Sequence, residues 1–156
     1  MQNVKKYKGI CKQGYQLASG RGANNPFGDS TIKLQLPYFK ERGFDLYEHI
    51  PNFVLGSVNV VLDNAQLKLK KADYTFEDLY WTDVVAPETF SFIHCTLEHN
   101  GSAYKGLVYY PHPETKPATN AHHYDRIEVI AEPVIGLEYG DEVTVVLSGD
   151  AFEEFA

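Results

Sequence analysis

The chain has 156 residues, of which 44% are hydrophobic and 22% charged, and its formal net charge is −7. This composition excludes a disordered or fibrous chain, and the acidic balance argues against a nucleic-acid partner. Because the sequence has neither a run of 18 apolar residues nor an apolar signal core near Met1, we expect no membrane partner and one cytoplasmic domain over residues 1–156.

The amino-terminal region combines a strand with a loop of small residues. Residues 7–17 predict a first strand interrupted by Gly14, and residues 18–28 predict a loop rich in turn formers. Residues 1–42 carry eight basic and two acidic side chains, whereas the remainder carries six basic and nineteen acidic ones. This basic segment either attracts an anionic ligand or is a solvated lysine-rich surface, and both interpretations stay open.

The next segment alternates apolar and polar residues. The alternation over residues 31–36 predicts a half-buried strand that ends at Pro37. Residues 38–42 predict a short helix closed by Gly43, and residues 44–55 an irregular connection.

The central feature is the strand predicted over residues 56–62. Side chains alternate across a strand, so Ser57 and Asn59 point to one side and the apolar residues point to the other. A hydroxyl and an amide carbonyl are hard oxygen ligands of the kind that Mg²⁺ accepts. The alternative is a half-buried strand with a polar outer face.

The following region contains a hairpin. Residues 63–87 predict a peripheral strand with connecting segments. Residues 90–98 and 102–110 predict two strands, and the Asn100-Gly101 pair between them favours a tight turn because both positions tolerate positive φ.

The carboxy-terminal third begins with a proline-punctuated loop over residues 111–123, which is long enough to be functional. Residues 126–131 and 142–147 predict the last strands. Since no long helix and no internal repeat is evident, the sequence predicts an all-β barrel.

Histidines in the long loop offer a different function. His112, His122 and His123 have Glu114 and Asp125 nearby, and such groups bind Zn²⁺ or Fe²⁺ in hydrolases and oxygenases. Adjacent histidines in an extended segment diverge, however, which disfavours one shared metal.

The two cysteines, Cys11 and Cys95, lie in separate apolar runs without the spacing of a metal site. We expect buried free thiols rather than a disulfide. The sequence also lacks a Gly-x-Ser-x-Gly elbow, a Gly-x-x-x-x-Gly-Lys phosphate loop and a Cys-x-x-Cys pair.

Five short motifs follow one another in an order that resembles the archaeal CTP-dependent riboflavin kinases over most of residues 8–148. The motifs are Ser19-Gly20-Arg21-Gly22, Leu34-Gln35-Leu36-Pro37, Gly56-Ser57-Val58-Asn59-Val60, Arg126-Ile127-Glu128-Val129-Ile130-Ala131 and Gly140-Asp141-Glu142-Val143. The resemblance implies a six-stranded cradle-loop barrel with peripheral loops and at most short helices. It also implies transfer of the γ-phosphoryl group of CTP to riboflavin, giving FMN.

The resemblance further implies Mg²⁺ as the cofactor, held by Ser57 and Asn59, with Ser57 replacing the family's threonine and keeping its hydroxyl. Glu128 matches the catalytic carboxylate near the flavin, and Thr115 or Thr119 matches a threonine that contacts the flavin. The residues that match the nucleotide-binding loop are Ser19, Gly20, Arg21, Gly22 and Ala23.

The chain departs from the family after residue 131. Family members place a Leu-Arg dipeptide and a short helix after the Ala-Pro step, where the nucleotide base is held. Here residues 131–136 pass directly to residues 137–141, so the base-reading element is shortened. Two functions follow: a riboflavin kinase-like phosphotransferase, or a non-catalytic nucleotide- or flavin-binding module on the same barrel.

Overall fold

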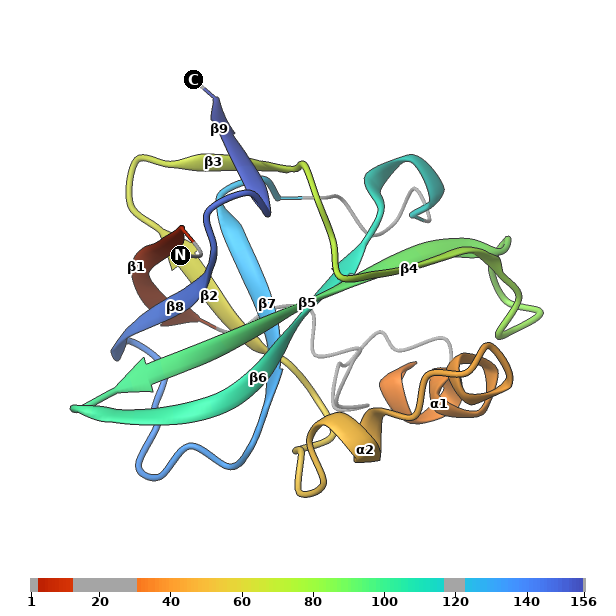
Figure 1. Ribbon diagram of the computed structural model, residues 1–156, viewed down its shortest axis with the longest axis horizontal. Helices are drawn as coiled ribbons and strands as arrows, with labels where there is room; N and C mark the ends of the chain where they lie inside the picture. Colours follow the sequence, from red (N-terminus) through yellow and green to blue (C-terminus); the bar gives the residue numbers. More distant parts are fainter. Residues whose placement is uncertain (1–2, 13–30, 117–122, 156) are drawn as a thin grey trace.

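The computed structural model describes residues 3–12, 31–116 and 123–155 (Figure 1). Nine strands, two α-helices and one 3₁₀ turn are assigned within these ranges. In chain order they are β1 (Val4–Lys12), α1 (Thr31–Glu41), α2 (Leu46–His49), β2 (Val58–Leu62), β3 (Gln66–Leu69), β4 (Tyr74–Leu79), β5 (Glu88–His99), β6 (Ser102–Pro111), η1 (Pro113–Thr115), β7 (Arg126–Ala131), β8 (Glu142–Ser148) and β9 (Phe152–Phe155).

Six of these strands close into an antiparallel barrel. The order of hydrogen-bonded neighbours is β5, β6, β7, β2, β1 and β8, and β8 pairs again with β5. Strand β4 extends the sheet beside β5, and β3 pairs with β9 in a separate two-stranded sheet. The predicted all-β barrel is therefore confirmed. Among the described residues, no helix has the length and apolar character needed to cross a bilayer.

The inside of the barrel is one of two hydrophobic cores. Val60, Leu97, Val129 and Val145 are fully buried there, each on a different strand. Cys95 belongs to the same cluster, and both cysteines are buried and free, as the sequence predicts. Burial raises the pKa of the Cys95 thiol to about 12, so this group stays protonated at neutral pH.

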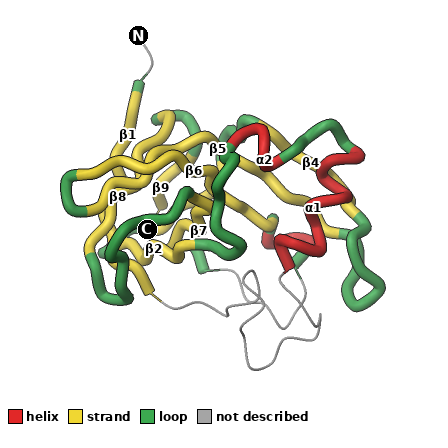
Figure 2. Tube along the Cα trace, turned by 90° about the horizontal axis from the view of Figure 1, so that it is seen from below, coloured by secondary structure: helices red, strands yellow, loops and turns green. Residues whose placement is uncertain are grey.

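The second core lies outside the barrel, between the two helices and the outer face of β4, β5, β6 and β7. Figure 2 shows α1 and α2 gathered on one side of the molecule, near β4. The rings of Phe39 on α1 and Phe92 on β5 pack together, and their centroids lie 5.1 Å apart. Leu107 faces this outer core, while its neighbour Val108 faces the barrel interior. Strands β5, β6 and β7 are thus buried on both faces, which explains their nearly continuous apolar runs.

The strand predicted over residues 31–36 is wrong, because this segment is the first part of α1. Its buried positions include Ile32, Gln35 and Phe39, which recur at helical spacing. Pro37 lies inside the helix instead of ending a strand. A short amphipathic segment satisfies both periods at some positions, and the need to place Phe39 against the sheet decides in favour of the helix.

The predicted closure at Gly43 is confirmed. Gly43 has φ +85°, and the amide of Phe44 donates to the carbonyl of Phe39 at 3.0 Å, as in a Schellman motif. The adjacent Arg42 donates from Nη1 to the carbonyl of Glu77 at 3.0 Å and from Nη2 to the carbonyl of Asp78 at 3.4 Å. The end of α1 is thereby tied to the backbone of β4.

The hairpin of β5 and β6 confirms the Asn-Gly prediction, since Asn100 and Gly101 have φ +49° and +79°. The predicted strand over residues 126–131 matches β7, and the one over residues 142–147 matches β8 to within one residue. Residues 63–87 hold two strands, β3 and β4, rather than one, and β9 was not predicted. Of the predicted first strand, residues 13–17 lie outside the described ranges.

A substitution at Gly9 of β1 tests how closely β1 and β2 pack in the barrel. A methyl group at this position would lie 2.5 Å from the carbonyl oxygen of Val61 on β2, a backbone atom that can move only with its strand. We expect Gly9→Ala to lower the free energy of unfolding by about 1–3 kcal/mol in urea titrations. Val4→Ala, at a site that is 56% exposed on the same strand, is the control and should change stability little. Equal unfolding midpoints for the two variants would contradict this.

Candidate functional site

Pairing between β2 and β7 brings together three residues that the sequence assigns to one site. Asn59 on β2 is paired directly with Glu128 on β7. The hydroxyl of Ser57 donates to Oε1 of Glu128 at 3.2 Å, across 71 positions of sequence. All three side chains are partly buried. A small oxygen-rich cluster therefore lies on this strand pair.

The cluster lies on the outer face of the barrel. The neighbouring residues Val60, Ile127 and Val129 are buried in the barrel interior. Because side chains alternate along a strand, Asn59 and Glu128 project to the opposite side. This is the arrangement that the alternation over residues 56–62 predicts.

Strand register extends the cluster into a row. Lys12, the last residue of β1, is paired with Asn59 and is exposed. On the other side of Glu128, Val108 of β6 is paired with Val129 of β7, so Tyr109 comes next to Glu128 along the row. The row thus runs across β1, β2, β7 and β6, and these strands contribute a lysine, an amide, a carboxylate and a phenol in that order.

The Glu128 carboxyl group is in a poorly solvated environment. Burial raises its pKa above the ordinary value of 4.5, while Lys116, the hydrogen bond from Ser57 and the charge of Arg126 act in the opposite direction. A carboxylate whose pKa is raised accepts protons more readily than a solvated one, which suits a general base.

Tyr109 closes one side of the cluster. Its hydroxyl donates to Oε1 of Gln35 on α1 at 2.8 Å, and both residues are buried. Burial first, and then the nearby carboxyl groups of Glu128 and Glu88, raise the pKa of Tyr109 well above 10.0. Tyr109 therefore remains a neutral phenol whose hydrogen-bond donor is already used by Gln35.

The donor set of the cluster fits Mg²⁺ better than a transition metal. The Ser57 hydroxyl is the donor of its hydrogen bond to Glu128, so the lone pairs of Ser57 Oγ are not used by that hydrogen bond. The Asn59 amide oxygen and the Glu128 carboxylate are likewise hard oxygen donors. In the described part of the chain, no group of three or more His, Cys, Asp or Glu side chains is arranged to hold a metal ion.

The predicted flavin contact Thr115 has a structural role in the turn after β6. Its hydroxyl accepts a hydrogen bond from the amide of Thr89 at 2.9 Å and donates to the carbonyl of His112 at 3.2 Å. Contact with a flavin stays a prediction for this residue. The other predicted binding residues, Ser19, Gly20, Arg21, Gly22, Ala23 and Thr119, lie outside the described ranges.

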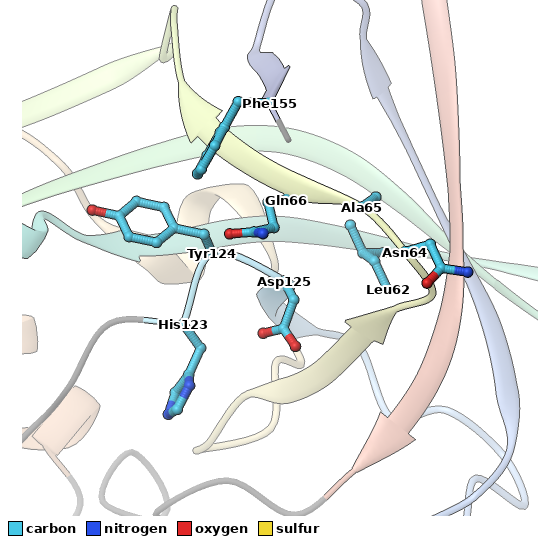
Figure 3. Close-up of a pocket in the computed structure, with 8 residues that line it drawn as sticks. All are labelled: Leu62, Asn64, Ala65, Gln66, His123, Tyr124, Asp125 and Phe155. Carbon is cyan, nitrogen blue, oxygen red and sulfur yellow. The ribbon is translucent and has the colours of Figure 1, made fainter.

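The histidines of the long loop occupy different environments. His112 Nε2 lies 2.6 Å from Ser91 Oγ and its Nδ1 lies 3.0 Å from Glu114 Oε1. His123 lines an open groove of about 670 Å³, and Figure 3 shows it at the opposite end of the labelled set from Phe155. His122 lies outside the described ranges. These contacts give no support to a shared metal.

Three lysines of the basic amino-terminal segment pair with carboxylates on the barrel surface. Nζ of Lys5 lies 2.7 Å from Glu154, and Nζ atoms of two further lysines lie within 4 Å of acidic side chains. These pairs are exposed, so they contribute little to stability. They favour the interpretation of a solvated lysine-rich surface for this part of β1, whereas Lys12 lies beside the cluster.

No model of a known protein family matches the chain, and no curated protein matches it.

Sequence reasoning missed two neighbours of Glu128: Tyr109, which comes next to it along the row, and Lys116, whose charge lowers its pKa. Tyr109 lies within apolar strand sequence, where its polarity is the only local signal. Lys116 lies in the proline-punctuated loop that the sequence predicts to be functional. The proximity of Tyr109 to Glu128 depends on strand register, which a single sequence does not encode locally.

Ionisation of Glu128 should destabilise the fold. Because the folded-state pKa is raised, the folded protein binds this proton more tightly than the unfolded chain, and stability falls as pH rises from about 4.5 through the folded pKa. We expect Glu128→Gln to remove this loss, which is about 1.4 kcal/mol for each pH unit that separates the unfolded-state and folded-state pKa values. Urea unfolding at several pH values measures it.

The matched control is Glu153→Gln, at an exposed position on β9. This variant should follow the wild-type pH dependence. If Glu128→Gln did the same, Glu128 would titrate as a solvated carboxyl group.

Proposed function

We propose that the protein is a Mg²⁺-dependent, riboflavin kinase-like phosphotransferase of the cytoplasm. It would transfer the γ-phosphoryl group of a nucleoside triphosphate, CTP by resemblance, to riboflavin and so form FMN. The observation that carries this proposal is the meeting of Ser57, Asn59 and Glu128. The resemblance assigns these residues to one site, and β2 and β7 bring them together.

The proposed reaction has a simple balance. A ribityl hydroxyl of riboflavin attacks the γ-phosphorus, a new P–O bond forms, and the bond to the β-phosphate breaks to release a nucleoside diphosphate. The hydroxyl proton passes to Glu128. Since Ser57 occupies Oε1 of Glu128, we assign the proton to Oε2.

The neighbours of Glu128 prepare it for this role. Burial raises its pKa, so the carboxylate is a stronger base than a solvated glutamate. Ser57 fixes the orientation of the carboxylate through its hydrogen bond. Mg²⁺ held by Ser57 and Asn59 would supply positive charge that neutralises the transferring phosphoryl group.

The second candidate is a binding module without catalysis, and the segment after β7 favours it. Residues 132–141 contain neither helix nor strand, and Ile135 and Tyr139 are exposed at 81% and 63%. The short helix with which family members hold the nucleotide base is missing from this segment. A chain with a weakened base site would retain a flavin or a nucleotide without turnover.

The deciding experiment incubates the pure protein with riboflavin, Mg²⁺ and each nucleoside triphosphate in turn, and detects FMN by chromatography. We expect FMN with at least one triphosphate, and none when Mg²⁺ is removed by chelation. Glu128→Gln serves as the inactive control. If no triphosphate gives FMN while riboflavin or nucleotide still binds, the protein is a binding module.

Asn59 tests the metal site. Asn59→Ala removes one proposed oxygen ligand, and we expect Mg²⁺-dependent nucleotide binding to weaken tenfold or more, which is about 1.4 kcal/mol. The fold should survive because Asn59 faces outward from the barrel. Isothermal titration calorimetry measures the effect, with the exposed Asn52→Ala as the control. Unchanged Mg²⁺ dependence in Asn59→Ala would refute the assignment.

The shortened segment after β7 predicts relaxed nucleotide choice. A site that pairs with the polar groups of a base rejects a wrong base strongly, whereas a site without such partners discriminates weakly. We expect kcat/KM for ATP or GTP to lie within about a hundredfold of that for CTP, or roughly 2.7 kcal/mol. Strict use of CTP would show that another segment reads the base.

A further inference from the structure

Two histidines that the proposed mechanism does not use lie together where α2 meets the sheet. His49 is the last residue of α2, and His94 is an exposed residue of β5. Their ring centroids are 5.5 Å apart. Tyr74 of β4 completes the group, because its ring centroid lies 5.3 Å from that of His49 and 5.4 Å from that of His94. The three rings therefore form a compact cluster that joins one helix to two strands.

The polar atoms of this cluster have few partners of their own. Oη of Tyr74 lies 3.0 Å from Nε2 of His94, and a single proton bridges these two atoms. Within the described ranges, the ring nitrogens of His49 make no hydrogen bond, and the contacts of this ring are with other rings. The cluster therefore offers imidazole nitrogens and a phenol oxygen whose one internal hydrogen bond uses one shared proton.

The separations within the cluster suit the ligands of a single metal ion. Two donor atoms that each lie about 2.1 Å from one ion are about 3.0–3.4 Å apart at bond angles between square and tetrahedral. The 3.0 Å between Tyr74 Oη and His94 Nε2 fits the lower value. Two imidazole rings bound to one such ion have centroids about 4.5–5.2 Å apart. A small rotation of the His49 side chain therefore brings its ring from the observed 5.5 Å into this range.

Neighbouring groups hold the two histidines in position. The ring of His49 stacks on that of Phe44, a member of the outer core, with centroids 4.7 Å apart. The backbone amide of His94 donates to Oδ2 of Asp73 at 2.8 Å, so a carboxylate also lies beside the cluster. Supporting contacts of this kind orient metal ligands before the ion arrives, and the negative charge of Asp73 favours a cation.

We propose that His49, His94 and Tyr74 form a site for one divalent transition-metal ion, Cu²⁺ or Zn²⁺, separate from the oxygen-rich cluster on β2 and β7. Imidazole nitrogens with a phenolate oxygen select these ions over Mg²⁺. The ion takes the place of the proton between Tyr74 and His94, and that proton passes to the solvent as the metal–oxygen bond forms. The bound ion fastens α2 to β4 and β5. With two histidines and a phenol, the set differs from groups of three His, Cys, Asp or Glu side chains, which are absent from the described residues.

The direct test titrates the whole protein with Zn²⁺ and, separately, with Cu²⁺ in a calorimeter, in buffer that contains excess Mg²⁺. We expect saturable binding of one Zn²⁺ ion per chain. His49→Gln and His94→Gln, each shown to be folded by circular dichroism, should weaken binding of both ions about tenfold or more, because one protein ligand is lost. His123→Gln, which removes a histidine from the groove beside Phe155, is the matched control and should bind as the wild type does. Absence of binding by the wild type, or unchanged affinities in both folded histidine variants, would overturn the proposal.

Two further measurements place the ion at this cluster. A phenolate ligand gives Cu²⁺ a charge-transfer absorption band in the visible range, so the Cu²⁺-loaded wild type should show this band and Tyr74→Phe should lose it. Zn²⁺ should raise the Tm of the wild type, because an ion that binds only the folded state stabilises it, and should raise it less in His49→Gln. A band that persists in Tyr74→Phe, or equal Tm increases in the wild type and His49→Gln, would show that the ion is held elsewhere and would refute the site.

Discussion

Burial of the same strands on both faces is the constraint on which the rest of this structure depends. Strands β5, β6 and β7 contribute alternate side chains to the barrel interior and to the core beneath the helices. Leu107 and Ile130, which face the helices, are paired with each other, as are Val108 and Val129, which face the interior. The outer core fixes α1 and α2 on the barrel, and its edge coincides with the row that contains Glu128. The polar site is therefore placed where the helix layer stops and the outer face of β2 and β7 begins.

This arrangement gives the site two different surroundings. On one side, Tyr109 and Gln35 form a buried hydrogen bond next to the aromatic core. On the other side, Asn59 leads to the exposed Lys12. A carboxyl group at such a boundary is poorly solvated but reachable, and this combination raises the pKa of Glu128 without isolating it. Sites of this kind destabilise a fold locally, and the extensive pairing of the closed barrel offsets that cost.

The sequence predicted the fold where local chemistry and tertiary context agree. The Asn100-Gly101 turn, the β-branched run of β7 and the closure at Gly43 each carry a local signal that the structure follows. The sequence-based prediction was wrong over residues 31–36. Three alternating apolar residues fit a strand pattern there, and the helix is favoured by a tertiary contact, that of Phe39 with β5. Within the site, Ser57, Asn59 and Glu128 were found through short motifs. Tyr109 was not, because it comes next to Glu128 through the register of β6 and β7 rather than through spacing along the chain.

The tie between Arg42 and β4 has a consequence for self-association. Ring closure leaves the six barrel strands without a free edge, whereas β4 pairs only with β5 in the described part of the chain. An unpaired strand edge invites another chain to add a strand and so to aggregate. A register shift between Phe76 and Leu79 interrupts β4, and at this point the Arg42 guanidinium donates to the carbonyls of Glu77 and Asp78. The end of α1 thus places the charged Arg42 side chain at an edge strand. A charged group at this position disfavours β-sheet extension, because an approaching apolar strand cannot easily displace it.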